Sequence, residues 1–362
     1  MKKRQIILTL VTAALLGTAQ SADACTGITL KSQDGHTIVA RTIEWGGSDL
    51  NSQYVIVPRG HRQQSLLPGG NTDGMTFTAR YGYVGLSVEQ ETFVAEGLNE
   101  AGLSAGLFYF PAYGQYEAYN PAEKATTIAD LQLVAYILGE CATVDDVKKA
   151  VAQVHIVQID PRASTVHWRF TDPSGRQIVL EIIEGGKVCF YDNPLGVLTN
   201  SPGLEWHLTN LNNYVNLYPG SAPAQELDGR RLSQFGAGSG FLGIPGDITP
   251  PSRFVRAAFY QATAPRQATA EKTILQGFQI LNNFDIPVGI EFADGKVPAD
   301  IPSATQWTSA TDPAGRAIYF RTMYNSAIRC INLKDINFTK VAYRAVPMDA
   351  VKQQPVERIA VQ

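Results

Sequence analysis

Short runs of alternating apolar and polar residues predict the first strands of the chain. Residues 25–31 alternate in this way, Asp34-Gly35 supplies a turn, and residues 37–41 return, which predicts a β-hairpin. Further strands with the same pattern are predicted at 53–57, 76–83 and 103–108.

Apolar residues recur at three- and four-residue spacing in the middle of the chain, which is typical of amphipathic helices. The first such segment is 128–138. Thr143 and Asp146 then form an acidic variant of the capping box, which opens a helix predicted to end at Val154. Further helices are predicted at 204–215, 252–262 and 271–281.

Two later hairpins share one local plan. Strands 165–171 and 176–183 flank an Asp-Pro-Ser-Gly turn, and strands 305–311 and 316–323 flank an Asp-Pro-Ala-Gly turn. Proline presets the backbone angle of such a turn, and glycine accepts the positive φ that closes it. The repetition favours two comparable antiparallel sheets, although one shared turn is also compatible with coincidence.

The order of these elements predicts the fold class. Strands come first, helices lie in the middle and strands return at the end, which favours an α+β fold with sheets stacked beneath helices. The segment 217–248 is rich in Gly and Pro, lacks periodicity and is predicted to leave the core as a long excursion. Because no linker divides the rest, we expect one domain over 25–362.

The first 24 residues predict export. Lys2, Lys3 and Arg4 precede an apolar run over 6–16, and Ala-Asp-Ala at 22–24 supplies the small residues that a signal peptidase requires. The apolar run is too short for a spanning helix, and no later segment is long enough. We therefore expect residues 1–24 to be removed from a periplasmic or secreted protein without a membrane span.

Charge and composition exclude several classes of function. The net charge is −3, and Lys and Arg do not cluster beyond the first residues, so a nucleic-acid or anionic-membrane partner is not indicated. No glycine-rich phosphate loop follows a strand, and the five histidines lack metal-ligand spacing. We expect no cofactor and no metal. Cys141, Cys189 and Cys330 are expected to be small buried residues, although an exported protein allows a disulfide between two of them.

Cys25 directly follows the predicted cleavage site and has three interpretations. It is a buried residue near the site by coincidence, the lipid-bearing cysteine of an exported lipoprotein, or an N-terminal nucleophile. Ala22 and Asp23 fit a lipoprotein signal poorly. A first-residue cysteine carries its own base, because an α-amine has a pKa of about 7.7–8.0 and accepts the thiol proton.

Two charged residues near the end of the first hairpin fit the third interpretation. The hairpin brings Arg41 close to Cys25, where a guanidinium favours the thiolate. Glu44 is placed to hold or orient the α-ammonium group. A surface ion pair is the commoner fate of such residues, so the hairpin alone leaves the question open.

Four motifs together resemble the choloylglycine hydrolases, which include bile salt hydrolases and penicillin V acylases. Their order and spacing match over essentially the whole chain from Cys25 onward. The motifs are Cys25-Thr-Gly27, Gly97-Leu-Asn-Glu-Ala-Gly-Leu103, Gly196-Val-Leu-Thr-Asn-Ser-Pro202 and Pro245-Gly-Asp-Ile-Thr-Pro-Pro-Ser-Arg253-Phe254. The resemblance implies an αββα sandwich of the N-terminal nucleophile hydrolases and the cleavage of a non-peptide amide bond.

The resemblance also implies roles for single residues. Cys25 matches the nucleophile, Arg41 and Arg253 match two active-site arginines, and Asn200 matches the asparagine whose amide serves the oxyanion hole. Tyr109 contributes its backbone N–H to the same hole. Ile43 and Ala95 would line the apolar substrate groove, and the 217–248 segment would lock a homotetramer.

Two positions depart from the family pattern. Glu44 stands where the family usually has Asp, and the retained carboxylate is expected to keep its role. Tyr109 stands where many bile salt hydrolases have Asn and penicillin V acylases tend to have Tyr. The resemblance implies conjugated bile salts as the first expected substrates; Tyr109 favours penicillin V as the close alternative, and long-chain acyl-homoserine lactones are a third. A non-catalytic lipoprotein anchored at Cys25 is the alternative from another class.

Overall fold

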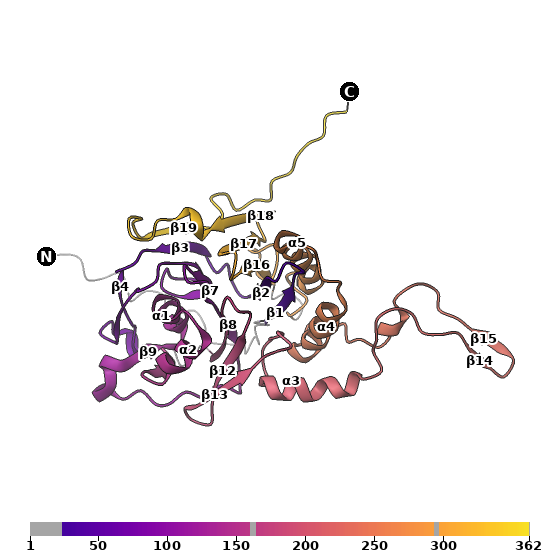
Figure 1. Cartoon of the computed structure of the whole chain (residues 1–362), viewed down its shortest axis with the longest axis horizontal. Coiled ribbons are helices and arrows are strands. Elements are labelled where there is room, and N and C mark those ends of the chain that lie inside the picture. The colour runs from indigo at the N-terminus through magenta and orange to yellow at the C-terminus, as the bar shows by residue number, and fades with distance from the viewer. Residues whose placement is uncertain (1–23, 160–163, 293–296, 362) are drawn as a thin grey trace.

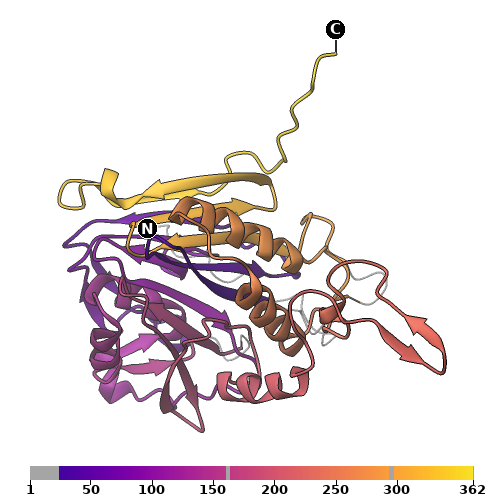
Figure 2. The ribbon, with the colours of Figure 1, turned by 45° about the vertical axis from the view of Figure 1, so that its right-hand side comes forward.

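The computed structural model describes residues 24–159, 164–292 and 297–361. The predicted signal peptide lies outside these residues except for Ala24. Two antiparallel sheets stack at the centre of the molecule, with helices over the outer face of each (Figures 1 and 2). This is the expected αββα sandwich.

The smaller sheet carries the start of the described chain and has five strands. In spatial order they are β1 (Ala24–Lys31), β2 (Thr37–Glu44), β16 (Thr305–Asp312), β17 (Ala317–Thr322) and β18 (Asn325–Asn332). Helices α4 (Pro250–Thr263) and α5 (Ala270–Leu281) pack on its outer face, where α4 contacts β1 and α5 contacts β2 and β16. In Figure 2 the two orange helices cover the indigo strands of this sheet.

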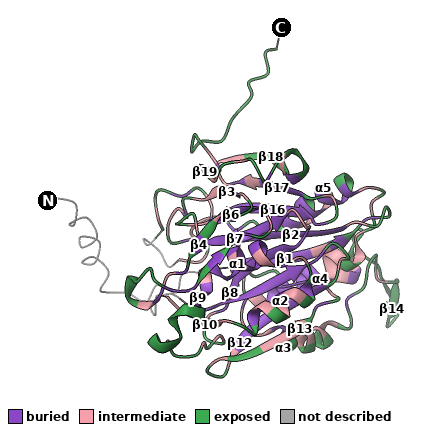
Figure 3. Cartoon of the chain, turned by 60° about the vertical axis from the view of Figure 1, so that its left-hand side comes forward, coloured by how far each residue is buried: buried purple, intermediate pink, exposed green. Residues whose placement is uncertain are grey.

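The larger sheet has eight strands and supplies the opposite wall of the interior. In spatial order they are β13 (Lys187–Asp192), β12 (Gln177–Ile183), β11 (Val166–Thr171), β8 (Ser104–Tyr109), β7 (Val94–Asn99), β6 (Tyr83–Ser87), β3 (Gln53–Val57) and β19 (Arg344–Pro347). Helix α1 (Leu133–Glu140) contacts β7 and β8, and α2 (Val144–Val151) contacts β11. The central strands of both sheets are buried (Figure 3).

The remaining elements are short. Three two-stranded ladders join β4 (Arg62–Gln64) to β5 (Thr76–Thr78), β9 (Thr127–Ala129) to β10 (His155–Val157), and β14 (Gln225–Leu227) to β15 (Arg230–Leu232). Helix α3 (Leu204–Asn210) precedes the last of these ladders. Single 3₁₀ turns occur at Pro68–Gly70, Pro121–Thr126, Asp130–Gln132, Leu211–Tyr214, Ser239–Phe241, Asn282–Phe284 and Leu333–Asp335. No helix among the described residues is both long and apolar enough to cross a lipid bilayer.

The predicted hairpins are confirmed, and the two repeated hairpins fall in different sheets. β11 and β12 belong to the larger sheet, whereas β16 and β17 belong to the smaller one. The capping box is also present: the Thr143 hydroxyl accepts from the Asp146 N–H, and the Asp146 carboxylate accepts from the Thr143 N–H. Helix α2 nevertheless ends at Val151, three residues earlier than expected.

Three predicted elements were wrong in part. The strand expected at 76–83 is split between β5 and β6, because the Tyr81 N–H donates to the Gly139 carbonyl and so leaves the ladder. The helix expected over 128–138 begins only at Leu133, because residues 127–129 pair with β10 as a strand. The helix expected over 204–215 ends at Asn210 and continues as a 3₁₀ turn.

The segment 217–248 leaves the core as predicted. Its β14–β15 hairpin projects from the side of the molecule beside α3 and α4 (Figure 1). The three cysteines other than Cys25 are free, and only Cys141 is buried. Cys189 is half-buried and Cys330 is exposed, because both lie on the edge strands β13 and β18, so the expectation of burial was wrong for these two.

Candidate active site

Cys25 lies at the start of β1, with its thiol directed between the two sheets. In the β1–β2 ladder Cys25 is opposite Ile43, and Gly27 is opposite Arg41. Alternate residues of a strand share a face, so Cys25, Gly27, Arg41 and Ile43 share one. Arg41 Nη2 lies 2.8 Å from Cys25 Sγ, which is the proximity that the hairpin predicts.

The guanidinium of Arg41 is fully buried and is held by main-chain carbonyls. Its Nη1 donates to the carbonyls of Ala95 at 3.1 Å and Leu107 at 2.5 Å, and its Nε donates to the Thr42 carbonyl at 3.2 Å. The ring of Phe108 lies 4.1 Å from the guanidinium carbon. These contacts aim Nη2 at the thiol, because the planar guanidinium fixes all its donors together.

Asn200 is placed beside Cys25 by a β-bridge that joins the motif beginning at Cys25 to the motif at 196–202. Gly27 and Leu198 exchange two backbone hydrogen bonds, at 2.7 and 3.1 Å, which align the 196–202 segment with β1. Two residues further along, Asn200 Oδ1 accepts from the main-chain N–H of Cys25 at 2.9 Å. Asn200 Nδ2 donates to the Tyr109 carbonyl at 2.7 Å.

Arg253 approaches from the opposite face of β1. It lies in the first turn of α4, where Pro250 occupies the first helical position. Its Nη1 donates to the Cys25 carbonyl at 2.6 Å and to Thr26 Oγ1 at 2.8 Å, and its Nη2 donates to Asn200 Oδ1 at 2.6 Å. One buried arginine therefore fixes both the main chain of Cys25 and the amide of Asn200.

Glu44 lies beside the residue that precedes Cys25. It is opposite Ala24 in the β1–β2 ladder, and its carboxylate is on the face of the sheet that Arg253 contacts. Thr305 Oγ1 donates to Oε1 at 3.4 Å, while Oε2 has no hydrogen-bond partner within the described chain. Burial raises the pKa of Glu44 to about 7, against the opposing effect of Arg253. The structure thus places the Glu44 carboxyl group opposite the residue that precedes Cys25, on the face of β1 that points away from the Cys25 thiol.

Burial and neighbouring charges act on the thiol in opposite directions. Burial raises the pKa of Cys25, and Glu44 adds to this effect. Arg41, the backbone N–H of Tyr109 and Arg253 lower the pKa of the same thiol. The Tyr109 N–H is therefore within hydrogen-bond range of the sulfur, at the position expected of an oxyanion-hole donor.

The two residues expected to bind substrate also lie close to Cys25. Ile43 is the cross-strand neighbour of Cys25. The carbonyl of Ala95 accepts a hydrogen bond from Arg41 Nη1, which also donates to the carbonyl of Leu107. Both residues are buried. All eight residues singled out from the sequence thus gather around β1, β2 and the strands that face them.

Sequence reasoning missed three buried residues near this cluster. His207 Nε2 lies 2.9 Å from the Asn200 carbonyl, and burial lowers the pKa of His207 to about 4. Glu96 and Arg169 lie behind Arg41, between the sheets. The detectable signal was a charged residue inside an otherwise apolar strand, as in Val94-Ala-Glu-Gly-Leu98.

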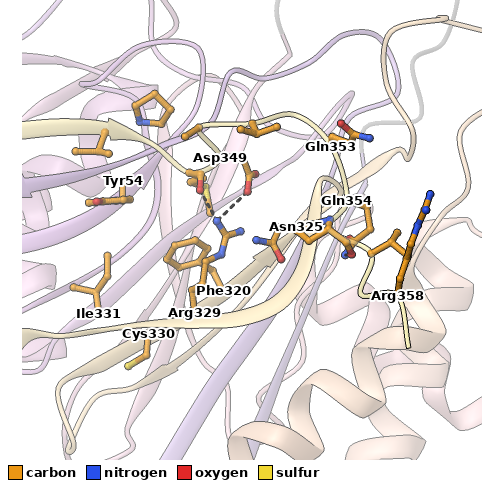
Figure 4. A pocket seen from close by; sticks show the side chains of 17 residues that line it. Tyr54, Phe320, Asn325, Arg329, Cys330, Ile331, Asp349, Gln353, Gln354 and Arg358 are labelled. Atoms are coloured by element: carbon orange, nitrogen blue, oxygen red, sulfur yellow. Dashed lines mark hydrogen bonds and ion pairs between the residues drawn. The ribbon is translucent and has the colours of Figure 1, made fainter. Parts of the chain in front are cut away.

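A cavity of about 940 Å³ lies away from this cluster (Figure 4). It is bounded by β18, β19 and the exposed C-terminal segment, and its Arg329 pairs with Asp349 at 2.9 Å. Its lining includes none of the eight site residues. Among the described residues no group of three or more His, Cys, Asp or Glu side chains is placed to hold a metal ion.

Comparison with known proteins points to one family. The family model described as linear amide C–N hydrolases, choloylglycine hydrolase family, matches residues 25–346. The bile salt hydrolase/transferase of Clostridium perfringens is 30% identical over 86% of this chain and 93% of its own length. The penicillin V acylase of Pectobacterium atrosepticum is 26% identical over 87% of this chain and 81% of its own length.

Solved structures agree with these sequence comparisons. A mutant of the conjugated bile acid hydrolase from Clostridium perfringens superposes with a TM-score of 0.79 at 27% identity, covering 93% of this chain and all of that one. Penicillin V acylase from Agrobacterium tumefaciens shares the fold, with a TM-score of 0.72 at 23% identity over 91% of this chain and 93% of its own. The chain belongs to the choloylglycine hydrolase family and is a hydrolase of non-peptide C–N amide bonds.

Proposed function

We propose that this protein hydrolyses the amide bond of conjugated bile salts with Cys25 as nucleophile, after export to the periplasm or beyond it removes residues 1–24. The observation that carries the proposal is the placement of two atoms of one residue. Cys25 Sγ is 2.8 Å from Arg41 Nη2, and the main-chain nitrogen of Cys25 is 2.9 Å from Asn200 Oδ1. Once Cys25 is the first residue, that nitrogen is an amine able to accept the thiol proton.

The proposed reaction begins with transfer of the thiol proton to this amine. The Cys25 thiolate then bonds to the amide carbon, and the carbonyl electrons move to the oxygen. The Tyr109 N–H and the second hydrogen on Asn200 Nδ2 stabilise this oxyanion, since an asparagine amide carries two donors. Arg253 holds Asn200 Oδ1, so that the amide nitrogen keeps its orientation toward Tyr109.

Collapse of the tetrahedral intermediate breaks the C–N bond. The departing amine takes the proton from the α-ammonium group of Cys25, which leaves a thioester. Water then attacks the thioester, passing a proton through the same amine, and the acid departs as the thiol re-forms. Glu44, opposite residue 24 in the ladder, is proposed to stabilise the positive form of the amine.

Bile salts are the proposed substrates because named relatives support them. Besides the Clostridium perfringens protein, the bile salt hydrolase/transferase of Lactiplantibacillus plantarum is 32% identical over 70% of this chain. Ile43 and Ala95 are proposed to form part of an apolar groove for the steroid. Tyr109, together with the Pectobacterium relative, favours penicillin V as the second candidate.

One purified sample of the protein beginning at Cys25 tests the substrate. We expect kcat/KM for glycocholate or taurocholate to exceed that for penicillin V and for a long-chain acyl-homoserine lactone, because the fused rings bury more apolar surface. Amine release measured with all four compounds at one pH gives the ranking. A higher kcat/KM for penicillin V would replace bile salts by the second candidate.

We also propose that the 217–248 segment joins subunits into a homotetramer. The segment exposes Leu232, Phe235 and Leu242, which line one common hollow, and clustered exposed apolar side chains mark interaction surfaces. Light scattering should show that Phe235→Ser combined with Leu242→Ser lowers the molar mass from that of a tetramer. Val356→Ser, at another exposed apolar residue, serves as the control and should leave the mass unchanged. A monomeric parent protein would refute the proposal.

A further inference from the structure

A chain of alternating charges extends from Cys25 into the space between the sheets. Arg41 contacts the thiol through Nη2, and its Nη1 lies 3.7 Å from Glu96 Oε2. Arg169 Nη2 lies 3.5 Å from the same carboxylate oxygen. The side chains of Arg41, Glu96 and Arg169 are at most 1% exposed, so water does not screen these charges.

Two glycines make room for this chain. Gly106 lies between Glu96 and Arg169 in the larger sheet, paired with each of them, and a Cβ at Gly106 would meet Glu96 Oε2. A Cβ at Gly27, which faces the larger sheet from β1, would lie 2.8 Å from Arg169 Nη1. At both positions, charged side chains occupy the space that a side chain larger than that of glycine would need.

Glu96 and Arg169 interact mainly through their charges, because each has a polar atom without a hydrogen bond among the described residues. Glu96 Oε2 and Arg169 Nη2 have no hydrogen-bond partner within the described chain, although their charges lie close together. Among the described residues, the Glu96 carboxylate accepts a hydrogen bond from Ser104 Oγ, at 3.3 Å from Oε1. A buried charge without full hydrogen bonding costs stability, so a merely structural role would be served better by apolar residues.

The balance of charge depends on the state of Cys25. Arg41 and Arg169 are cations at any physiological pH, and Glu96 neutralises one of them. The three side chains therefore carry one net positive charge when Glu96 is ionised, and a Cys25 thiolate brings the buried set to neutrality. Burial raises the pKa of Glu96, and the two guanidinium groups lower it.

We propose that Glu96 and Arg169 are positioning residues that set the proton affinity of the Cys25 thiol through Arg41. The inference rests on the proposed role of Cys25 as nucleophile. Glu96 limits the positive field that Arg41 presents to the sulfur, and Arg169 limits the negative field of Glu96. The other groups that act on the thiol are Glu44 of β2, Arg253 of α4, the Tyr109 N–H of β8 and, in the protein beginning at Cys25, its own α-amine, and all remain in the variants below.

Opposite shifts from two variants test the proposal. Glu96→Gln removes a negative charge near the thiolate and should lower the Cys25 pKa by about one pH unit. Arg169→Gln removes a positive charge and should raise the Cys25 pKa by a similar amount. The double variant should return close to the parent, because the net charge of the set is restored.

The measurement is the rate of Cys25 alkylation by iodoacetamide as a function of pH. Mass spectrometry of the N-terminal peptide of the protein beginning at Cys25 separates this thiol from exposed Cys330. Asp145→Asn, which breaks an exposed pair with Arg176, is the matched control and should not shift the midpoint. The direction of the shift in the Cys25 pKa tests the proposal in each single variant separately. If one variant does not fold, the other still gives the test.

The outcomes separate the two levels of the argument. Equal midpoints in all variants, with Cys25 alkylated, would overturn the charge-setting role and leave Cys25 as nucleophile. Shifts of the Cys25 pKa in the same direction in both single variants would also overturn it. Removal of opposite charges shifts a pKa in opposite directions, whereas a structural disturbance does not depend on the charge removed. Absence of alkylation at Cys25 in the parent would instead refute the proposed nucleophile, and this inference with it.

Discussion

Replacing Cys25 by serine should leave a folded protein whose amide hydrolysis is slower by on the order of a thousandfold or more. The reason is that a serine hydroxyl is far less acidic than a thiol, so Arg41 at 2.8 Å no longer has an anion to stabilise. The substitution changes one buried atom, and the surrounding hydrogen bonds of the main chain persist. Initial rates on glycocholate, with circular dichroism to establish folding, provide the measurement.

The matched control for this variant is Cys330→Ser. Cys330 is exposed on the edge strand β18, far along the smaller sheet from β1, so its substitution should leave the rate unchanged. Turnover in the Cys25→Ser protein within about tenfold of the parent would remove Cys25 from the role of nucleophile.

A single residue retained before Cys25 should abolish activity to a similar degree. The α-amine would become a peptide nitrogen, which does not accept a proton at physiological pH, so neither the thiol nor the leaving amine would have a proton carrier. The described structure already accommodates such a residue, since Ala24 pairs with Glu44 and is buried. The loss should therefore appear in kcat without a loss of folding.

A removable extension provides the control for this experiment. The same added sequence, followed by a protease site that leaves Cys25 first, should regain full activity when it is cleaved in the unfolded protein and the product is refolded. Mass spectrometry of the exported protein identifies its natural first residue. Full activity with the extension uncleaved would contradict the proposed base, and a lipid on Cys25 would favour the lipoprotein alternative.

The local parts of this fold were predictable because short-range chemistry determines them. The Asp-Pro-Ser-Gly and Asp-Pro-Ala-Gly turns specify hairpins without outside help, and Thr143 caps its helix through its own neighbour Asp146. The first hairpin likewise sufficed to bring Arg41 to Cys25. Residues 128 and 129 were misassigned to a helix because their strand partner, 155–157, is provided by a distant segment.

Beyond the first hairpin, the residues of the site were predictable only where a motif identified them. Asn200 and Arg253 were singled out by resemblance alone, since no local pattern brings residues 175 and 228 positions away to Cys25. Glu96 and Arg169 escaped notice for a related reason. These two residues lie near Arg41 only because strands of the two sheets face each other. No pattern in the sequence indicates which residues of the two sheets come into contact.

The burial of Ala24 in the β1–β2 ladder has a consequence for the order of events during maturation. The peptide bond between Ala24 and Cys25 is part of a completed strand, with Glu44 opposite Ala24 and Arg253 bonded to the Cys25 carbonyl. A peptidase must draw its target into an extended, accessible form, which this strand denies. We therefore expect the proposed removal of residues 1–24 to occur while the polypeptide is still unfolded, and a molecule that folds before this cleavage would be an inactive zymogen.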